Sequence, residues 1–227
     1  LEKGFNLYKP YRRISKIDDA ILNSLPIAFD SELGFITASP SNLGTGMRAS
    51  VMCFLPACKL CGKIEDIIQR AKENELTVRG IYGEGSRALG YFYQISNQGS
   101  LGLSEDEIID KVSEFIYAIC QQEKENRDYL LESDYASVRD KTMRAYGQLL
   151  HCYSLEEEEM LGLLSQVKLG QVLSFIEITN DDKFQKLYYE GMSANLKEIF
   201  EFSDKKKENI IRAEYISSKV RELTKEV

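Results

Sequence analysis

The run GFITASPSNLGTGMRASV, residues 34–51, decides how the first half of this 227-residue chain folds. Its first five residues have strand character, and so do the residues from 49 onward, whereas Ser, Pro, Asn and Gly between them are typical of a turn. The turn delivers Arg48 to the start of the second strand. A short turn between two strands favours an antiparallel or mixed sheet over a repeated βαβ pattern.

The residues after this run continue in the same way up to a long helix. All four prolines lie in the first 56 residues, and ten of the fifteen glycines lie between positions 34 and 102. Strands are predicted over 34–38, 49–55, 76–82 and 91–96, with one helix over 57–74. Ser104 and Glu107 have the spacing of a capping box, and the apolar stripe after them predicts a helix that ends near Glu132.

From residue 133 onward, the sequence pattern predicts helices. No proline occurs there, and apolar spacing predicts helices over 138–153, 156–169, 195–202 and 208–223. We therefore expect an α+β domain over 1–132, with an antiparallel or mixed sheet flanked by helices, and a small all-α domain over 133–227.

Composition narrows the classes of function. Twenty-nine basic and 36 acidic residues leave a net charge of −7, which opposes non-specific binding to nucleic acid. No apolar run is long enough for a membrane span, and the chain does not open with a secretory leader. Five scattered cysteines fit reduced thiols in a cytoplasm. Because Leu1 is bulky and not Met, we expect the numbering to begin inside a longer natural chain.

Two arginines and one glutamate are the candidate ligand-binding residues. The second unusual stretch, VRGIYGEG at residues 78–85, contains Arg79 and a glycine-flanked Glu84. Arginine presents a planar fork that matches phosphate or carboxylate oxygens, and glycines let a ligand approach the backbone. A hairpin turn beside a surface arginine is the alternative interpretation. Neither a Walker motif nor a complete G-x-G-x-x-G occurs. Cys58 and Cys61 have no second cysteine pair, so no metal site formed by side chains is expected.

These stretches, followed by YQISN at 93–97 and LGLSE at 101–105, resemble the phosphagen (ATP:guanidino) kinases. The three motifs occur in the family's order and spacing over about residues 20–132. The helical extension is similar to that of the bacterial protein-arginine kinases, the McsB branch. The resemblance implies a catalytic lobe of the glutamine-synthetase/guanidino-kinase type, with ATP and Mg²⁺ as cofactors.

The resemblance also implies roles for individual residues. Arg48 and Arg79 resemble arginines that hold the ATP phosphates, and Glu84 resembles a carboxylate that holds the acceptor guanidinium. The stretches that contact the nucleotide are then Arg48, Ala49, Ser50, Val51 and Met52, and Arg79, Gly80, Ile81, Tyr82, Gly83 and Glu84.

The function implied is phosphorylation of arginine side chains of proteins in a bacterial cytoplasm. The implied partners are protein substrates with exposed arginines, Clp-type protease machinery, a zinc-binding activator protein and a second copy of the chain. A non-catalytic adaptor or dimerisation module that retains part of a nucleotide fold is the main alternative. A kinase of free arginine or another small guanidine is the third, and the helical extension disfavours it.

The chain departs from the family pattern in three places. A Ser-x-Arg-x-Arg clamp and an acidic-His-Leu-Arg segment do not occur in these residues, so we expect weak ATP binding and little phosphotransfer by this chain alone. Ser39 stands where the family often has a reactive cysteine. Glu208 stands where the family's phosphoarginine-reading Arg-Asp-x-x-Arg-Ala pattern has its first arginine, which disfavours binding of phosphate there. Only Arg212 and Ala213 match that pattern.

Overall fold

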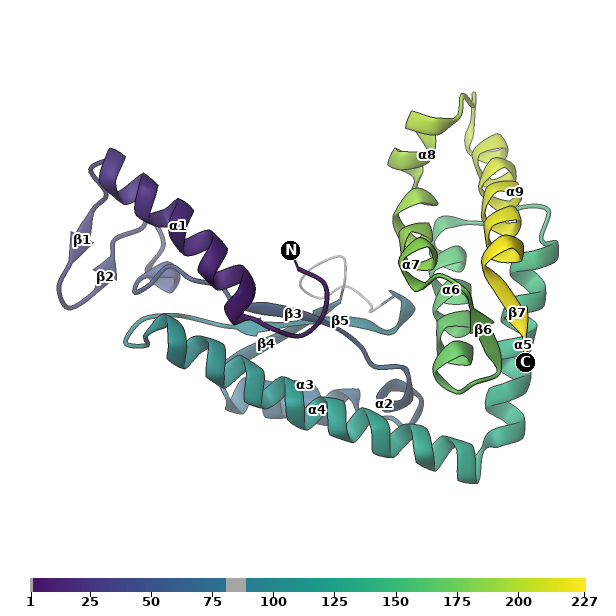
Figure 1. Cartoon of the computed structure of the whole chain (residues 1–227), viewed down its shortest axis with the longest axis horizontal. Helices are drawn as coiled ribbons and strands as arrows, with labels where there is room; N and C mark the ends of the chain where they lie inside the picture. Colours follow the sequence, from purple (N-terminus) through teal and green to yellow (C-terminus); the bar gives the residue numbers. More distant parts are fainter. Residues whose placement is uncertain (1, 81–88) are drawn as a thin grey trace. The chain divides into compact units, whose positions relative to one another are not determined.

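The computed structural model describes residues 2–80 and 89–227, which form two compact units (Figure 1). The sheet unit contains residues 2–80 and 92–124, and the helical unit contains 89–91 and 125–227. The predicted α+β class is confirmed. The division passes through helix α4 (Glu105–Ser133), between residues 124 and 125, and the expected domain boundary at 132/133 stays a prediction.

The sheet unit is built on three antiparallel strands in the order β3-β5-β4. These are β3 (Ser50–Phe54), β5 (Phe92–Asn97) and β4 (Leu76–Gly80), within or beside the predicted ranges. Side chains alternate between the two faces, and Cys53, Tyr93 and Ile95 are buried on the face covered by α3 (Ile64–Glu73) and α4 (Figure 1). Burial raises the pKa of the Cys53 thiol to about 12.

The single helix expected over 57–74 is wrong, because the structure has two. Helix α2 (Pro56–Leu60) ends before Gly62, and α3 begins after it. Gly62 has a φ of +69°, in the left-handed region that cannot continue a right-handed helix. Gly62 therefore separates two helices, although the apolar spacing continues across it.

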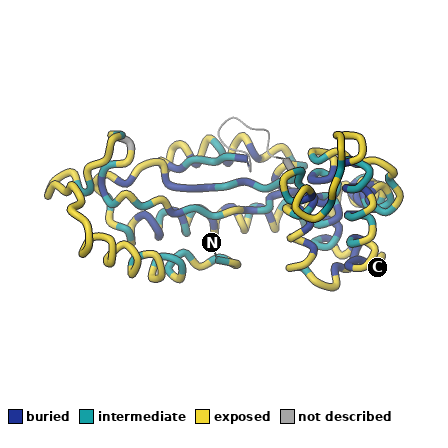
Figure 2. Tube along the Cα trace, turned by 90° about the horizontal axis from the view of Figure 1, so that it is seen from above, coloured by how far each residue is buried: buried dark blue, intermediate teal, exposed yellow. Residues whose placement is uncertain are grey.

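An amphipathic helix that the sequence analysis did not predict precedes the sheet. Helix α1 (Tyr8–Ser24) has no buried residue, and Figure 2 shows it exposed along nearly its whole length. A two-stranded antiparallel hairpin follows, formed by β1 (Phe29–Asp30) and β2 (Gly34–Phe35), and then a 3-10 turn, η1 (Pro40–Asn42). The predicted strand over 34–38 is thus limited to the two residues of β2.

Polar side chains define the start of helix α4 and join the helix to α2. The predicted capping box is present: Ser104 N donates to Glu107 Oε2 at 2.8 Å, and Glu107 N donates to Ser104 Oγ at 3.3 Å. Further along, the buried Glu123 carboxylate accepts from the backbone N–H groups of Ala57 at 3.1 Å and Cys58 at 2.9 Å. These two hydrogen bonds fasten the start of α2 to α4.

The helical unit consists of packed helices and a small antiparallel ribbon. Its elements are η2 (Leu89–Tyr91), α5 (Tyr135–His151), α6 (Glu157–Val172), β6 (Ile176–Ile178), α7 (Asp181–Glu190), α8 (Ser193–Ile199), α9 (Lys205–Leu223) and β7 (Thr224–Glu226). The sequence analysis predicted neither α7 nor the pairing of β6 with β7. Gly170 lets α6 approach α5, because a Cβ there would lie 2.5 Å from Thr142 Cγ2. Throughout the described residues, no helix has the length and apolarity required to span a membrane.

Candidate functional site

One face of the three-stranded sheet carries both predicted arginines. On β5, Gln94 pairs with Arg79 of β4, and Ser96 pairs with Ser50 of β3, so these four side chains share a face. Arg48, two residues before Ser50, joins them, since its Nη2 donates to Ser96 Oγ at 3.2 Å. We call Arg48, Ser50, Arg79, Gln94 and Ser96 the polar face. It lies opposite the face covered by α3 and α4.

Asn97 fixes the backbone on both sides of Arg48. The Ala49 N–H donates to Asn97 Oδ1 at 2.8 Å, and Asn97 Nδ2 donates to the carbonyl oxygens of Met47 and Gly99, each at 3.0 Å. The Asn97 side chain is buried, so these bonds are shielded from water. This positioning residue was not predicted as part of the site, although it ends the quoted YQISN motif.

The turn before Arg48 depends on a glycine. Gly44 has a φ of +102°, and a Cβ there would lie 2.8 Å from the Leu101 Cα. Its N–H donates to the Leu33 carbonyl at 2.9 Å, and Ser100 Oγ donates to the Leu43 carbonyl at 2.9 Å. The turn is therefore packed onto the backbone that follows β5, and a side chain at position 44 would displace it.

The other predicted nucleotide-contacting residues divide between the two faces. Ser50 and the exposed Met52 lie on the same face as Arg48. Ala49 and Val51 alternate to the opposite face, and Gly80 is buried at the end of β4. Any contact that a ligand on the polar face makes with Ala49 or Val51 would therefore use their backbone atoms.

The remaining predicted site residues lie outside the described part of the chain. Ile81, Tyr82, Gly83 and Glu84 fall between residues 80 and 89. The structure brings Arg48 and Arg79 to one face of the sheet, and the role of Glu84 stays a prediction.

The polar face has the chemistry of an anion site. Two guanidinium groups are flanked by hydroxyl and amide groups, and such donors match phosphate oxygens. No described carboxylate belongs to this face, and no cluster of three His, Cys, Asp or Glu side chains suited to a metal was found among the described residues. Mg²⁺ bound here would be held by phosphate oxygens and water, which is how proteins commonly bind it.

Residues 1–126 match the family described as ATP:guanido phosphotransferase, C-terminal catalytic domain. The chain belongs to this family. Residues 135–227 match the protein-arginine kinase McsB C-terminal domain. These are the two families that the sequence motifs indicated.

Curated relatives support the same assignment. The chain is 38% identical over 219 residues to a protein-arginine kinase of Clostridium acetobutylicum, a match that covers 96% of this chain and 64% of the relative. It is 37% identical to a protein-arginine kinase of Caldanaerobacter subterraneus, with 96% and 64% covered. A crystal structure of lombricine kinase is 31% identical, with a TM-score of 0.49, 59% of this chain covered and 36% of that chain covered. The chain thus spans about two thirds of the length of the curated relatives.

A third arginine, in the McsB-like domain, has a different environment. Arg212 of α9 is fully buried, and its Nε donates to the Gly191 carbonyl at 2.7 Å. Its Nη1 donates to Asn209 Oδ1 at 2.7 Å, and its Nη2 donates to Ser193 Oγ at 3.1 Å and pairs with Glu208. Glu208, which stands where the family pattern has its first arginine, therefore supplies an anionic partner to Arg212 from within the chain.

Glu208 is charged in this cluster. Burial acts to raise its pKa, but hydrogen bonds from Lys205, Ser193 and Arg212 outweigh burial and lower the pKa to about 2. Lys205 Nζ lies 2.7 Å from Glu208 Oε1. The buried guanidinium is therefore neutralised from within the chain.

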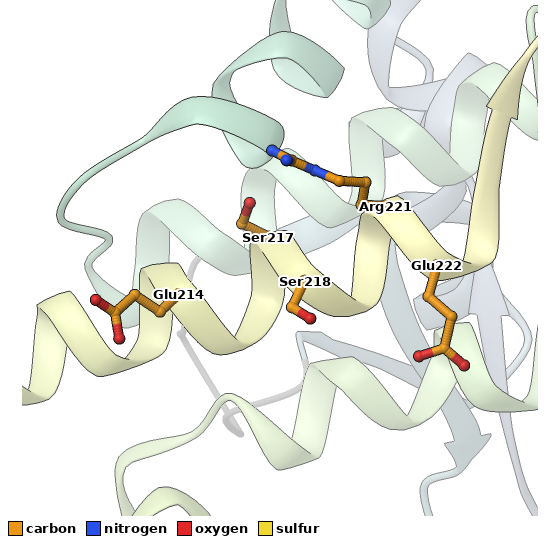
Figure 3. A pocket seen from close by; sticks show the side chains of 5 residues that line it. All are labelled: Glu214, Ser217, Ser218, Arg221 and Glu222. Carbon is orange, nitrogen blue, oxygen red and sulfur yellow. The ribbon is translucent and has the colours of Figure 1, made fainter.

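An open depression on α9 lies elsewhere in the helical unit (Figure 3). It is lined by Glu214, Ser217, Ser218, Arg221 and Glu222. Ser217 Oγ and Arg221 Nη2 both donate to the Leu150 carbonyl, at 2.9 Å and 2.6 Å. These contacts fasten α9 to the end of α5, so this depression is explained by helix packing.

Proposed function

We propose that this chain carries the phosphate-binding part of an ATP-dependent protein-arginine kinase. The observation that carries the proposal is the shared face of Arg48 and Arg79, with the backbone around Arg48 held by Asn97. Phosphoryl transfer requires alignment and charge neutralisation more than covalent help from the protein. Two arginine side chains on a preformed sheet would align the transferring phosphoryl group and neutralise the charge of its oxygens.

The acceptor side of the reaction is assigned to Glu84. A guanidinium is a poor nucleophile because it is cationic and delocalised, with a pKa above about 12. A carboxylate hydrogen-bonded to it would orient one nitrogen and accept its proton as the N–P bond forms. Mg²⁺, when bound with ATP, would neutralise phosphate charge, while Arg48 and Arg79 hold the phosphate oxygens.

Binding of Mg·ATP tests the polar face directly. Isothermal titration of the chain should show that Arg48→Ala and Arg79→Ala each weaken ATP binding by about tenfold or more, because each removes charge-assisted hydrogen bonds. Arg70→Ala is the matched control, since Arg70 is exposed on α3 and bonds Gln122. Equal affinity in all four proteins would remove the basis of the proposal.

Turnover tests how much of the reaction this chain performs. We expect little acid-labile phosphate to pass from ATP to a folded acceptor protein, because the chain spans about 64% of its relatives' length and lacks the Ser-x-Arg-x-Arg clamp. Robust transfer by the 227-residue chain would contradict this expectation.

The acceptor class follows from the second family region. The match of residues 135–227 to the McsB domain favours protein arginines over a free small guanidine. A comparison of free arginine with a folded arginine-containing protein as acceptor, in a complete enzyme that contains this chain, tests the choice. Preference for free arginine would favour the small-guanidine kinase, and ATP binding without transfer to either would favour the adaptor module.

The biological setting is part of the same proposal and rests on the family. We place the protein in the bacterial cytoplasm, acting on proteins with exposed arginines. Clp-type protease machinery, a zinc-binding activator protein and a second copy of the chain are its proposed partners. Affinity capture from the source cell, followed by mass spectrometry for phosphoarginine and for these partners, tests the assignment.

A further inference from the structure

The connection between β4 and β5 leaves the sheet unit before it returns to it. Strand β4 ends at Gly80 and β5 begins at Phe92, and two neighbouring antiparallel strands can be joined by a turn of about two to five residues. The connection instead takes residues 81–91, which we call the β4–β5 connection. Its last three residues form η2, which belongs to the helical unit. The chain thus passes to the helical unit and back between two strands of one sheet.

Gly90 allows η2 to lie directly on helix α6. A Cβ at position 90 would lie 2.5 Å from Ser165 Oγ and 3.2 Å from the Leu161 carbonyl oxygen. Gly90 also has a φ of +73°, in the left-handed region that favours glycine. Ser165 is itself held in place, because it is buried and its Oγ donates to the Leu161 carbonyl at 2.8 Å. The close approach of η2 to α6 therefore depends on this glycine.

The next residue, Tyr91, is held by the same helix. Tyr91 has a φ of +61°, a conformation that is rare for a bulky side chain and persists only where the surroundings hold it. Gln166, the residue after Ser165 on α6, donates from Nε2 to the Tyr91 hydroxyl. Helix α6 thus holds η2 at two consecutive positions, through the backbone at Gly90 and through the side chain at Tyr91. Backbone strain of this kind is concentrated at functional sites.

The β4–β5 connection also carries the proposed acceptor-binding residue. Glu84 lies five residues before Leu89, the first residue of η2. A carboxylate that orients one guanidinium nitrogen must be placed accurately, since a misplacement of about 1 Å can cost about 100-fold in rate. An element that fixes one end of the connection therefore bears on the acceptor step.

We propose that helix α6 positions the acceptor side of the reaction by holding η2, with Gln166 as the positioning residue. The proposal rests on the proposed function, in which Glu84 holds the acceptor guanidinium. The phosphate-binding arginines do not depend on this contact, because Arg79 is placed by the pairing of β4 with β5 and the backbone around Arg48 is held by Asn97. Loss of the hydrogen bond between Gln166 and Tyr91 should therefore slow phosphotransfer without weakening ATP binding.

Kinetics of variants in a complete enzyme that contains this chain test the proposal. Tyr91→Phe and Gln166→Ala each remove the hydrogen bond from one side. We expect each to lower kcat for transfer from ATP to a folded acceptor protein by about tenfold, while the Kd for Mg·ATP changes by less than about twofold. The double variant should be no slower than either single variant, because both lose the same contact. Gln166→Glu should restore most of kcat, since its carboxylate can accept from the Tyr91 hydroxyl.

Tyr215→Phe is the matched control. It also removes a tyrosine hydroxyl from the helical unit, one that donates to Glu190 Oε2 at 2.8 Å on α7 and not to η2. We expect the control to keep the kcat of wild type. Thermal unfolding of all variants, followed by circular dichroism, should show that Tyr91→Phe and Gln166→Ala are destabilised no more than the control.

Four results would overturn the inference. These are wild-type kcat in both Tyr91→Phe and Gln166→Ala, an equal loss of kcat in the Tyr215→Phe control, losses that multiply in the double variant, or a loss of ATP affinity as large as the loss of kcat. A wild-type enzyme that transfers no phosphate to protein arginines would refute the proposed function and this inference with it. Normal turnover by the Tyr91→Phe and Gln166→Ala variants would refute the inference alone.

Discussion

The arginines of the two units differ in what surrounds them. Arg48, at the start of a sheet strand, is exposed and donates to Ser96 at 3.2 Å. Arg212, in the helical unit, is fully buried and bonds two carbonyl oxygens, two polar side chains and Glu208. A guanidinium whose donors point into the protein acts as a structural cross-link, whereas one at the surface can exchange water for a ligand's oxygens.

The comparison of Arg48 with Arg212 shows that a match to a family motif does not by itself fix the role of an arginine. Both arginines occupy positions that the family patterns indicate as anion-binding. In the helical unit, the Glu208 carboxylate, four residues before Arg212, pairs with the Arg212 guanidinium. This arginine therefore stabilises the fold. The environment of an arginine therefore decides its role more than its place in a motif.

The largest expected effect comes from a substitution that breaks the buried cluster of Arg212 and Glu208. Arg212→Ala should lower the free energy of unfolding of the helical unit by about 3–5 kcal/mol, because it leaves the buried Glu208 carboxylate with Lys205 and Ser193 alone and removes the donor to the Gly191 and Leu155 carbonyls. Urea unfolding followed by far-UV circular dichroism measures this effect. Arg144→Ala, at an exposed pair with Asp140 on α5, should cost less than about 1 kcal/mol. If the two variants unfold alike, the cluster is not structural.

A pH series sharpens the same comparison. The folded pKa of Glu208, about 2, lies below its ordinary value of 4.5, so its contribution is fully present above pH 4.5 and is lost as pH falls toward 2. Glu208→Gln should therefore destabilise the helical unit at pH 7 by on the order of 2–3 kcal/mol, and the difference from wild type should shrink between pH 4.5 and pH 2. A difference that is constant with pH would contradict the assignment of charge to Glu208.

A smaller effect is expected where Asn97 supports the polar face. Asn97→Ala removes three hydrogen bonds from a buried site and should cost about 1–3 kcal/mol of stability. It should also weaken Mg·ATP binding, because the backbone around Arg48 loses its anchor. Asn74→Ala, at an exposed asparagine that bonds the Arg70 carbonyl, is the control and should leave ATP binding unchanged. Titration calorimetry and urea unfolding together separate the two consequences.

Local signals in the sequence predicted the parts of the fold that depend on neighbouring residues. The capping box at Ser104 and Glu107, the alternation of the sheet strands and the periodicity of α9 each depend on residues close in the chain. Helix α1 was missed although its apolar spacing was present in the sequence. Its stripe adds nothing to the described core, so it was not needed to account for the sheet.

Long-range anchors could not be predicted in this way. Asn97 reaches a backbone 48 residues away, and Glu123 reaches the start of α2 over 66 residues. Both are polar side chains that a sequence analysis would place at the surface. Only the packing of strands and helices buries them and brings them to the backbone groups that they bond. The two arginines of the polar face were identified by motif, but their common face depends on the register of three strands.

The two buried thiols of the sheet unit give it an intrinsic reporter of its own opening. Cys53 and Cys58 are both inaccessible, and the pKa of Cys53 is too high for a thiolate to form at neutral pH in the closed state. Their alkylation must therefore wait for local unfolding, while the exposed Cys120 reacts at once. The rate at which Cys53 is labelled therefore measures how often β3 is uncovered, and the rate for Cys58 measures how often α2 opens.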